Sequence, residues 1–218
     1  MVNSISEIEE NNVHKIYDII SDHFDTTRKV IWPKVNDFIE SFDYNSTILD
    51  IGCGNGKNMG TRADCNYIGL DSCQKLLDIA KKKKNCSYIF GNCLNLPFKN
   101  NTFNYAMSIA VIHHLSTTTR RLKCIQEIER ILKKKGKALL YVWSFEQEKF
   151  KDEKNQDVSV KWKLQKNKKT NTQETILYRY YHLFKKNELE NMILECKNLK
   201  IIESGNQYNN WYCIIEKI

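Results

Sequence analysis

The segment best suited to chemistry is a glycine-rich stretch that follows a short apolar run. Residues 48–56 read ILDIGCGNG. Thr47–Ile51 has the composition of a buried strand. Glycine at positions 52, 54 and 56 allows the backbone to turn sharply and to bring its amides close to a ligand. The pattern therefore predicts a strand that ends in a ligand-binding loop.

Two acidic residues indicate which ligand this loop accepts. Asp50 lies at the entrance of the loop, and Asp71 follows the next predicted strand. A carboxylate that faces a phosphate group would repel it, whereas the same carboxylate beside an ammonium group would attract it. Asp71 is placed to accept hydrogen bonds from ribose hydroxyls. The pair favours S-adenosylmethionine over a nicotinamide dinucleotide, so we expect S-adenosylmethionine as the cofactor.

Further cofactor contacts are expected where other strands end. Asn92 follows the third predicted strand and would lie near an adenine ring, with Cys93 supplying a backbone amide. The predicted cofactor-binding residues are Asp50, Gly52, Gly54, Asp71, Ser72, Asn92, Cys93 and Ala110.

Short apolar runs alternate with helical patterns along most of the chain. Strands are expected at 47–51, 67–70, 87–90, 103–109, 137–145, 178–184, 199–203 and 210–216. Helices are expected around 13–24, from Pro33, after a cap at Ser72, from about Thr119 to just before Gly136, and over 186–196. This alternation predicts an α/β fold of the Rossmann-like type, with a mostly parallel, doubly wound sheet and an antiparallel C-terminal strand.

The chain is expected to form a single domain over residues 1–218. Residues 1–44 carry two amphipathic helices, and the polar, lysine-rich residues 146–174 predict a loop or flexible insertion. No stretch approaches the roughly 18 uncharged apolar residues of a membrane span, so no membrane association is expected. The N-terminus lacks the pattern of a signal peptide. We therefore expect a cytoplasmic protein that can also be present in the nucleus.

The net charge of +8 fits a polyanionic partner such as RNA. Part of this charge has a second explanation, because the lysines at 81–84 and 133–135 end predicted helices, where cations complement the helix dipole. The eight cysteines contain no Cys-x-x-Cys pair, so no metal site is predicted and the thiols are expected to stay reduced.

Several distant segments together resemble the eukaryotic tRNA methyltransferases that esterify 5-carboxymethyluridine at the wobble position of the anticodon. They are His14–Tyr17, Thr27-Arg28, Trp32-Pro33, Ser108–His114, Arg120-Arg121, Tyr141–Trp143, Glu146-Gln147, Gln156–Val158, Trp162, Tyr178–Leu183 and Asn210-Trp211. The resemblance implies a class I methyltransferase fold, S-adenosylmethionine as methyl donor and tRNA as substrate. It also implies a heterodimer with a small zinc-binding activator protein, which adds a strand to the sheet edge near the third strand. Asn92 stands where this family usually has an aspartate.

The resemblance and the basic charge also suggest roles for individual residues. Arg28 and Arg179 would anchor the substrate carboxylate or phosphates, while His113 and Tyr17 would shape the pocket. Arg28, His113 and Tyr17 are therefore predicted as catalytic residues. The predicted substrate-binding residues are Trp32, His114, Arg120, Arg121, Trp143, Arg179 and Tyr180.

Most of these residues also have a purely structural explanation. Tyr17 could belong to the core of the first helix, and Arg120 and Arg121 could form a solvated helix face. One histidine of the pair 113–114 is expected to satisfy a backbone hydrogen bond. Trp143 could pack rather than stack on a base, and about half of the residues 180–182 should face the core, since side chains alternate along a strand.

Two other functions fit parts of the sequence. The first is a small-molecule methyltransferase acting on quinone or lipid precursors, which Leu96–Phe98 and the histidine pair fit equally well. The second is a non-catalytic, cofactor-binding RNA adaptor, against which the nearly complete cofactor motif argues. Methyl transfer to carboxymethylated tRNA separates the three possibilities.

Overall fold

The computed structural model describes residues 6–164 and 174–218. Its strands are β1 Thr47–Ile51, β2 Asn66–Asp71, β3 Ser87–Phe90, β4 Phe103–Ile109, β5 Leu132–Trp143, β6 Asp157–Leu164, β7 Thr175–His182, β8 Leu199–Gln207 and β9 Asn210–Lys217. Its helices are α1 Glu7–Glu9, α2 Lys15–Thr27, α3 Pro33–Glu40, α4 Gln74–Lys83, α5 Thr118–Ile131 and α6 Glu188–Leu194. Short turns of π or 3-10 helix are η1 Glu10–His14, η2 Ile112–His114 and η3 Glu148–Phe150.

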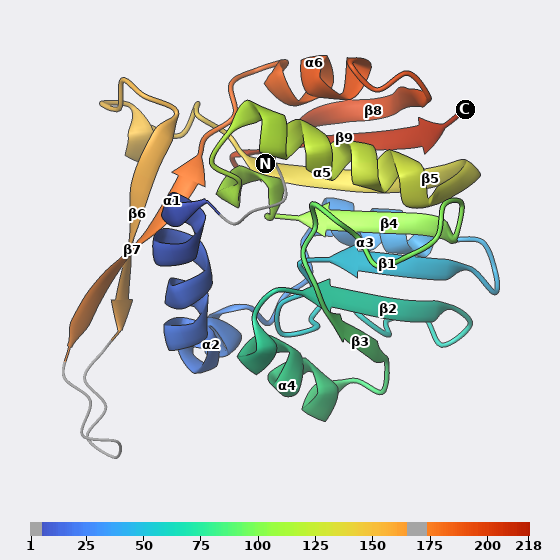
Figure 1. The fold of residues 1–218 in the computed structure, drawn as a ribbon, viewed down its shortest axis with the longest axis horizontal. Coiled ribbons are helices and arrows are strands. Elements are labelled where there is room, and N and C mark those ends of the chain that lie inside the picture. Colours follow the sequence, from blue (N-terminus) through green and yellow to red (C-terminus); the bar gives the residue numbers. More distant parts are fainter. Residues whose placement is uncertain (1–5, 165–173) are drawn as a thin grey trace.

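The main sheet has the strand order β3-β2-β1-β4-β5-β9-β8 (Figure 1). Strands β1 to β5 are parallel, and β9 pairs antiparallel with both β5 and β8. The predicted fold, a mostly parallel sheet with an antiparallel C-terminal strand, is confirmed. The strand order reverses between β1 and β4, and in open sheets of this kind ligands bind at that switch point, beyond the carboxyl ends of the strands.

Helices cover both faces of the sheet. Ile125 and Ile128 of α5 and Ile193 of α6, all fully buried, pack on one face. Ile39 of α3 and Leu77 of α4 pack on the other. Because both faces are covered, the central strands consist of continuous apolar runs. Strands β1, β3 and β4 have the bounds that the sequence predicted.

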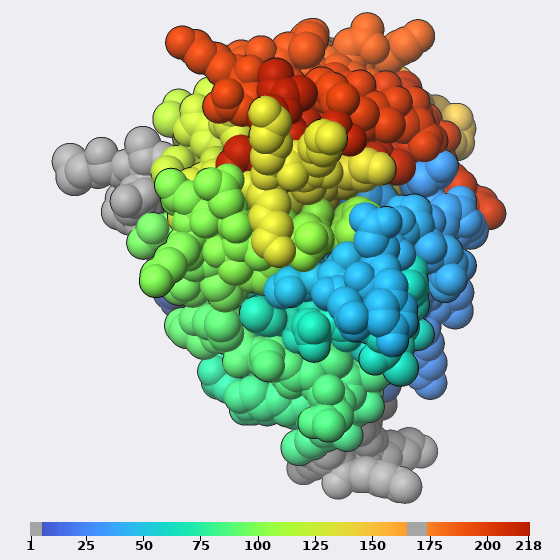
Figure 2. Space-filling model, turned by 90° about the vertical axis from the view of Figure 1, so that its right-hand side faces the viewer, coloured from blue at the N-terminus to red at the C-terminus, as the bar shows by residue number. Residues whose placement is uncertain are grey.

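The helix predicted to continue to Gly136 ends earlier, at Ile131. The backbone amide of Thr102 donates to the carbonyl of Ile131 at 2.8 Å, and Leu132 already pairs with Phe103 in the sheet. The lysines at 133–135 therefore belong to β5 and not to a helix end, so the helix-dipole explanation for their charge was wrong. Figure 2 looks onto this end of the molecule, where the start of β5 (yellow) reaches the surface.

The loop predicted for residues 146–174 contains a strand. β6 pairs antiparallel with β7 in a separate two-stranded sheet, and Figure 1 shows α2 between this hairpin and the main sheet. Trp162 of β6 is only 8% exposed, because it packs against Ile16 and Ile20 of α2. The prediction of a flexible insertion was therefore wrong for Asp157–Leu164, and residues 165–173 lie outside the described residues.

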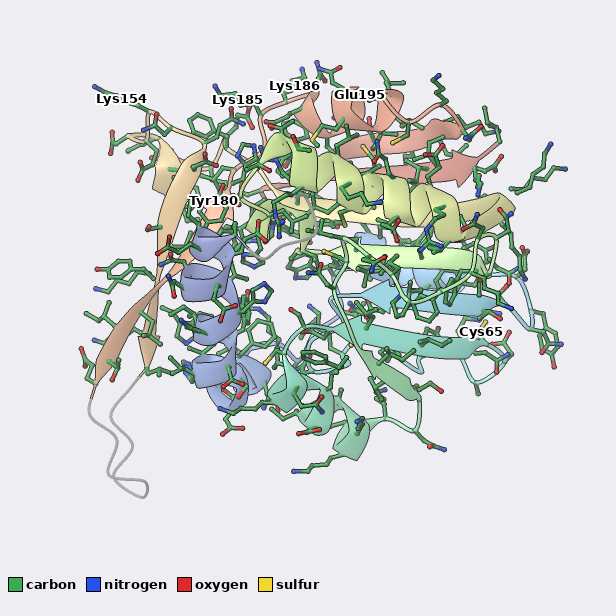
Figure 3. The ribbon with its side chains drawn as sticks, viewed as in Figure 1. Cys65, Lys154, Tyr180, Lys185, Lys186 and Glu195 are labelled. Carbon is green, nitrogen blue, oxygen red and sulfur yellow. The ribbon has the colours of Figure 1, made fainter. Side chains whose placement is uncertain are left out.

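Residues 6–164 and 174–218 contain neither a candidate membrane span nor a candidate metal site. None of the helices there is both long and apolar enough to cross a membrane. No group of three or more His, Cys, Asp or Glu side chains in these ranges is arranged to hold a metal ion. The described cysteines are free thiols, and Figure 3 places Cys65 at the end of the sheet where β1 and β4 begin.

Candidate active site

A cavity of about 470 Å³ lies at the carboxyl ends of the parallel strands. The loops after β1, β2, β3 and β4 and the end of β5 line one side of it. Helix α2, the linker to α3 and Tyr181 of β7 line the other side. The cavity therefore occupies the switch point of the sheet, with the N-terminal helices as its cover.

The glycine loop after β1 is tied to the end of β2. The amides of Gly52 and Cys53 both donate to the carbonyl of Leu70, at 2.7 and 3.0 Å. Gly52 has a φ of +69°, and a Cβ atom there would lie 2.3 Å from a methyl group of Val111. Only glycine fits this position, because the backbone conformation and the close approach of Val111 both exclude a side chain.

Asp71 joins the glycine loop to the loop that precedes α4. Its two carboxylate oxygens accept hydrogen bonds from the amides of Gly54 and Cys73, each at 2.8 Å. Burial raises the pKa of Asp71 above its ordinary value, while these backbone hydrogen bonds act in the opposite direction. Asp71 also lines the cavity.

Ser72 lines the cavity but does not cap a helix as predicted. Helix α4 begins after Cys73, without a side-chain cap. The hydroxyl of Ser72 instead lies 3.2 Å from Nδ1 of His14, so it connects η1 to the loop after β2. Asn92, Cys93 and Ala110 also line the cavity, as does Gly54. The Oδ1 atom of Asn92 accepts from the amide of Leu94 at 2.8 Å, which fixes the orientation of the side-chain amide.

Asp50 differs from the other predicted cofactor-binding residues, because it lies beneath the glycine loop and does not line the cavity. It is 1% exposed, and its Oδ2 atom has no hydrogen-bond partner among the described residues. Burial, and next to it the negative charge of Asp71, raises the pKa of Asp50 to about 7. Such a carboxyl group gains most from a cation bound close by.

The side of the cavity away from the glycine loop is built on Tyr17 and His114. His114 donates from Nδ1 to the carbonyl of Tyr180, so its Nε2 accepts from the hydroxyl of Tyr17, both at 2.9 Å. Arg179 donates to the same hydroxyl at 3.3 Å. Burial lowers the pKa of His114 to about 3, so the ring is neutral in the physiological range. Tyr17 and His114 thus form a fixed wall rather than an acid–base pair.

The prediction that His113 shapes the pocket is contradicted by its position. His113 is fully buried and does not line the cavity, whereas His114 does. Its Nδ1 accepts from the amide of Trp143 at 3.2 Å, and its ring stacks on Tyr181 with the centroids 4.7 Å apart. Both histidines of the pair therefore satisfy a backbone hydrogen bond, His113 at the amide of Trp143 and His114 at the carbonyl of Tyr180. The 3-10 turn η2 directs only the second histidine into the cavity.

Arg120 and Arg121 are also placed differently from the prediction. Arg120 is 6% exposed and holds Glu9 through bonds of 2.7 and 2.6 Å. Arg121 is 4% exposed and donates to the carbonyl of Leu115 at 2.9 Å and to the hydroxyl of Thr118 at 3.1 Å. Neither guanidinium is available to RNA, because both are buried in structural contacts.

We expect Arg120→Ala to destabilise the protein without changing its affinity for an RNA substrate. The change leaves the buried carboxylate of Glu9 without its ion pair, which costs about 3 kcal/mol. Thermal or denaturant unfolding measures this loss. Arg62→Ala is the matched control, because Arg62 pairs with Asp64 at a more exposed site. A weaker affinity for RNA at full stability would contradict the structural role of Arg120.

Arg179 and Tyr180 do not line the cavity and contact residues that do. Arg179 is 2% exposed, with its guanidinium 4.5 Å from the ring centroid of Trp162, and it does not line the cavity. It is a positioning residue for Tyr17, not a direct anchor. The hydroxyl of Tyr180 donates to Asp157 at 2.6 Å, and Figure 3 shows Tyr180 where the hairpin passes the N-terminal helix.

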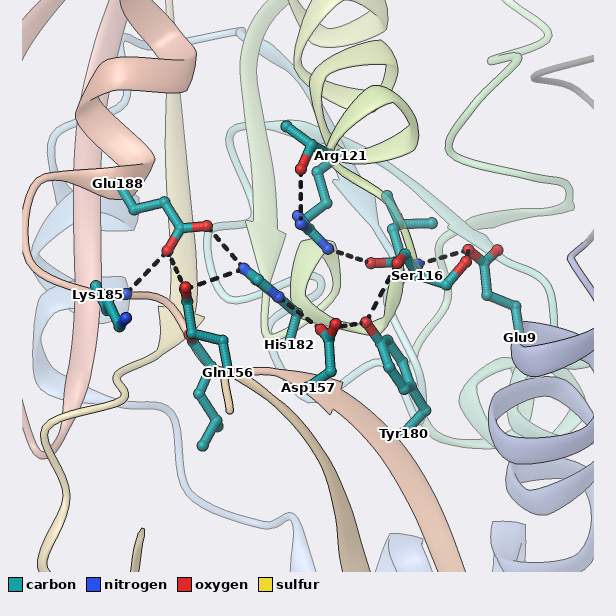
Figure 4. A network of polar contacts seen from close by, with 12 residues as sticks. Glu9, Ser116, Arg121, Gln156, Asp157, Tyr180, His182, Lys185 and Glu188 are labelled. Carbon is teal, nitrogen blue, oxygen red and sulfur yellow. Dashed lines mark hydrogen bonds and ion pairs between the residues drawn. The ribbon is translucent and has the colours of Figure 1, made fainter. Parts of the chain in front are cut away.

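The hairpin is held by a polar network around Asp157 (Figure 4). His182 of β7 lies 2.7 Å from a carboxylate oxygen of Asp157 and 2.7 Å from one of Glu188. Tyr180 extends the network at Asp157, and its hydroxyl lies 3.4 Å from the carbonyl of Ser116. Since Glu188 belongs to α6, the network anchors β6 and β7 to the main domain and fixes the carbonyl that holds His114.

Besides Tyr17 and His114, three more residues from the predicted catalytic and substrate-binding sets line the cavity. The carbonyl of Arg28 accepts from Asn55 of the glycine loop at 3.0 Å, and its guanidinium lies 5.1 Å from the ring centroid of Phe24. Trp32 packs on Tyr141. The ammonium group of Lys149 lies over the ring of Trp143, 3.8 Å from its centroid, in a cation–π contact. Among these three, Arg28 is the one that brings a permanent charge to the cavity.

Several lining residues were missed from the sequence. They include Glu9, His14, Phe24, Lys29, Asn55, Lys57, Val111 and Tyr181. Lys57 directly follows the glycine loop, a signal that could have identified it. Burial and the charge of Arg28 lower the pKa of Lys57 to about 8.

Comparison with known proteins identifies the family. Residues 49–140 match the model of a methyltransferase domain. A tRNA (carboxymethyluridine(34)-5-O)-methyltransferase of Schizosaccharomyces pombe is 40% identical over 97% of this chain and 98% of its own length. The chain belongs to this methyltransferase family. The homologue of that name from Xenopus tropicalis is 33% identical over 98% of this chain, but the chain spans only 42% of that longer protein.

Solved structures support the methyltransferase fold. A Haloferax volcanii methyltransferase, described in complex with the Trm112 methyltransferase activator, has a TM-score of 0.69 at 12% identity, covering 94% of this chain and 97% of that one. The amino pentose methyltransferase CalS10 of Micromonospora echinaspora, described with bound S-adenosylmethionine, has a TM-score of 0.69 at 13% identity, covering 92% and 97%.

The cavity of this methyltransferase fits S-adenosylmethionine, which is its cofactor. The glycine loop lets a ligand approach its backbone, and Asp71 is placed for ribose hydroxyls. The buried Oδ2 of Asp50, which has no hydrogen-bond partner among the described residues, adds a carboxyl group beneath the glycine loop. Arg28, Tyr17 and His114 line the same cavity.

We expect Asp50→Asn to weaken S-adenosylmethionine binding by about tenfold at pH 8, because it removes a buried negative charge near a cation. The wild-type affinity should fall as the pH drops from 8 to 6, since Asp50, with a pKa of about 7, becomes protonated. The affinity of the variant should lack this pH dependence. Calorimetric titration at both pH values measures it, and a pH dependence unchanged in the variant would contradict the role of Asp50.

The same variant should be more stable than the wild type without ligand. The pKa of Asp50 is raised on folding, so the folded chain retains a proton that the unfolded chain loses between about pH 4 and pH 7. Wild-type stability therefore decreases as the pH rises through this range. Asparagine removes the cost of the buried charge, and we expect a gain of about 2 kcal/mol at pH 8 in denaturant unfolding.

Proposed function

We propose that this chain transfers the methyl group of S-adenosylmethionine to the 5-carboxymethyl group of the wobble uridine in tRNA and forms a methyl ester. The observation that carries the proposal is the 40% identity with the fission-yeast methyltransferase across nearly the whole of both chains. The net charge of +8 supports a nucleic-acid substrate.

Bound S-adenosylmethionine supplies an electrophilic methyl group on a sulfonium ion. The acceptor is a carboxylate whose reference pKa is about 4, so it is ionised at neutral pH and needs no general base. The geometry agrees with this, because His114 is neutral and both of its ring nitrogens are in hydrogen bonds. We propose that Arg28 holds the carboxylate by its charge. Tyr17 and Trp143 close the wall around it and exclude water.

We also propose a small zinc-binding activator protein as partner, docked on the edge strand β3. This strand ends the main sheet, and Phe90 on it is 61% exposed. An open strand edge with an exposed aromatic side chain is a surface that a further strand can cover. The activator described in the Haloferax complex supports a partner of this kind.

The decisive experiment is methyl transfer to tRNA that carries 5-carboxymethyluridine, with and without a Trm112-type activator. We expect an alkali-labile methyl ester on the wobble nucleoside, detected by nucleoside mass spectrometry, and a higher rate with the activator. The same tRNA without the carboxymethyl group is the control substrate. Methylation of quinone or lipid precursors with none of tRNA would overturn the proposal, as would tRNA binding without any methyl transfer.

A further inference from the structure

A second hollow of about 400 Å³ opens beside the cavity. It lies between the linker that follows α2, the glycine loop and the end of α4. Arg28, Lys29, Asn55 and Lys57 line both hollows, so the second one runs directly out of the cavity. We call it the basic groove, because its other charged lining residues are Lys83 and Lys84.

The charge of the basic groove comes from three separate segments of the chain. Arg28 and Lys29 follow α2, Lys57 follows the glycine loop, and Lys83 and Lys84 end α4. No Asp or Glu among the described residues lines the groove. Asp25 of α2 contacts two of the lining residues, through an ion pair with Lys83 and a hydrogen bond from Asn55 at 2.7 Å.

Helix capping explains only part of this cluster. The lysines of the last turn of α4 complement the helix dipole, as do cations at other helix ends. Lys29 and Lys57 belong to other segments and gain nothing from that dipole. The positive charge of Arg28 contributes to the lowered pKa of Lys57, which shows that these cations repel one another in the free protein. An anion bound in the groove would relieve this repulsion.

We propose that the basic groove binds the sugar–phosphate backbone of the RNA strand next to the nucleotide in the cavity. The inference rests on the proposed function, because a nucleotide inside a chain can enter the cavity only if the strand leaves it across the adjoining surface. The groove offers that path with lysine and arginine side chains, which contact phosphates without regard to base sequence.

Lys84→Glu tests the groove, since Lys84 lines the groove but not the cofactor cavity. We expect the KM for tRNA to rise about tenfold at low salt, with kcat and the KM for S-adenosylmethionine unchanged. The difference should shrink at high salt, because phosphate contacts are screened. Lys84→Arg should behave as wild type. The matched control is Lys134→Glu, at an exposed position near the start of β5, at the opposite end of the sheet.

The outcomes separate this inference from the proposed function. The wild type could methylate tRNA while Lys84→Glu and the Lys134→Glu control have the same KM for tRNA. That result would overturn the proposed role of the groove and leave the proposed function intact. A weaker affinity of Lys84→Glu for S-adenosylmethionine would also overturn the proposed role of the groove, because Lys84 would then contribute to cofactor binding. If the wild type methylates no tRNA, the proposed function fails. Fluorescence anisotropy with an anticodon stem-loop RNA then tests the groove by itself, and equal binding by both variants overturns it.

Discussion

Gly52→Ala is expected to lower kcat/KM for tRNA methylation by roughly a hundredfold or more, through loss of S-adenosylmethionine affinity. The new methyl group would lie 2.3 Å from Val111, and its residue would have to adopt a φ of +69°. Either the loop moves away from Leu70 or Val111 displaces the turn that carries His114. Both movements change the cavity, so the effect on binding should exceed the effect on folding stability.

Two further variants isolate the cause. Gly60→Ala has a comparable backbone strain, with a φ of +58°, but Gly60 does not line the cavity, so cofactor affinity should stay near wild type. In the double variant Gly52→Ala/Val111→Ala, the colliding methyl groups are removed, and part of the affinity should return. Calorimetric titration with S-adenosylmethionine measures all three. Wild-type affinity in Gly52→Ala would show that the close packing at Val111 does not matter.

Arg28→Ala is expected to lower kcat/KM for tRNA by about a hundredfold, with little change in S-adenosylmethionine affinity. Arg28 is the arginine that lines the cavity, whereas the guanidinium of Arg179 is buried against Trp162 and Tyr17. Removing it would take the arginine away from the proposed acceptor carboxylate and leave Lys29 and Lys57 as the cations that line the cavity. Arg28→Lys should retain part of the rate, because it keeps the charge but loses the planar pair of donors.

Steady-state kinetics with tRNA varied, together with calorimetric titration of the cofactor, measure this effect. Arg62→Ala is the matched control, because its guanidinium pairs with Asp64 and does not line the cavity. If the loss in Arg28→Ala appeared in the affinity for S-adenosylmethionine instead, Arg28 would hold the donor, and our assignment to the acceptor would be wrong.

The donor half of the site could be predicted from the sequence because it is local. A strand, three alternate glycines and an acidic residue after the next strand lie within a short stretch. In a parallel sheet the carboxyl ends of neighbouring strands lie at the same edge, so these residues come together there. Gly52, Asp71 and Asn92 accordingly line one cavity. Asp50 was the exception, because its side chain points under the loop, a detail that depends on the pleat of β1.

The acceptor half was less predictable, because its geometry depends on distant partners. Arg120 is buried by Glu9, more than a hundred positions away in sequence, so helical spacing alone could not show that it is structural. The choice between His113 and His114 depends on the 3-10 turn η2. β6 did carry a signal, because Val158, Val160 and Trp162 alternate with polar residues, but the lysine-rich composition around them outweighed it.

The bond between His114 and the carbonyl of Tyr180 has a consequence for how this protein can evolve. The loops after β1 and β2 line the cavity with Gly52, Gly54 and Asp71, whereas the hairpin β6–β7 orients His114 and, through Arg179, Tyr17. The orientation of these two side chains therefore depends on the hairpin. Exchange of the hairpin for one from a relative with another acceptor should change the choice of acceptor more than it changes the affinity for the donor.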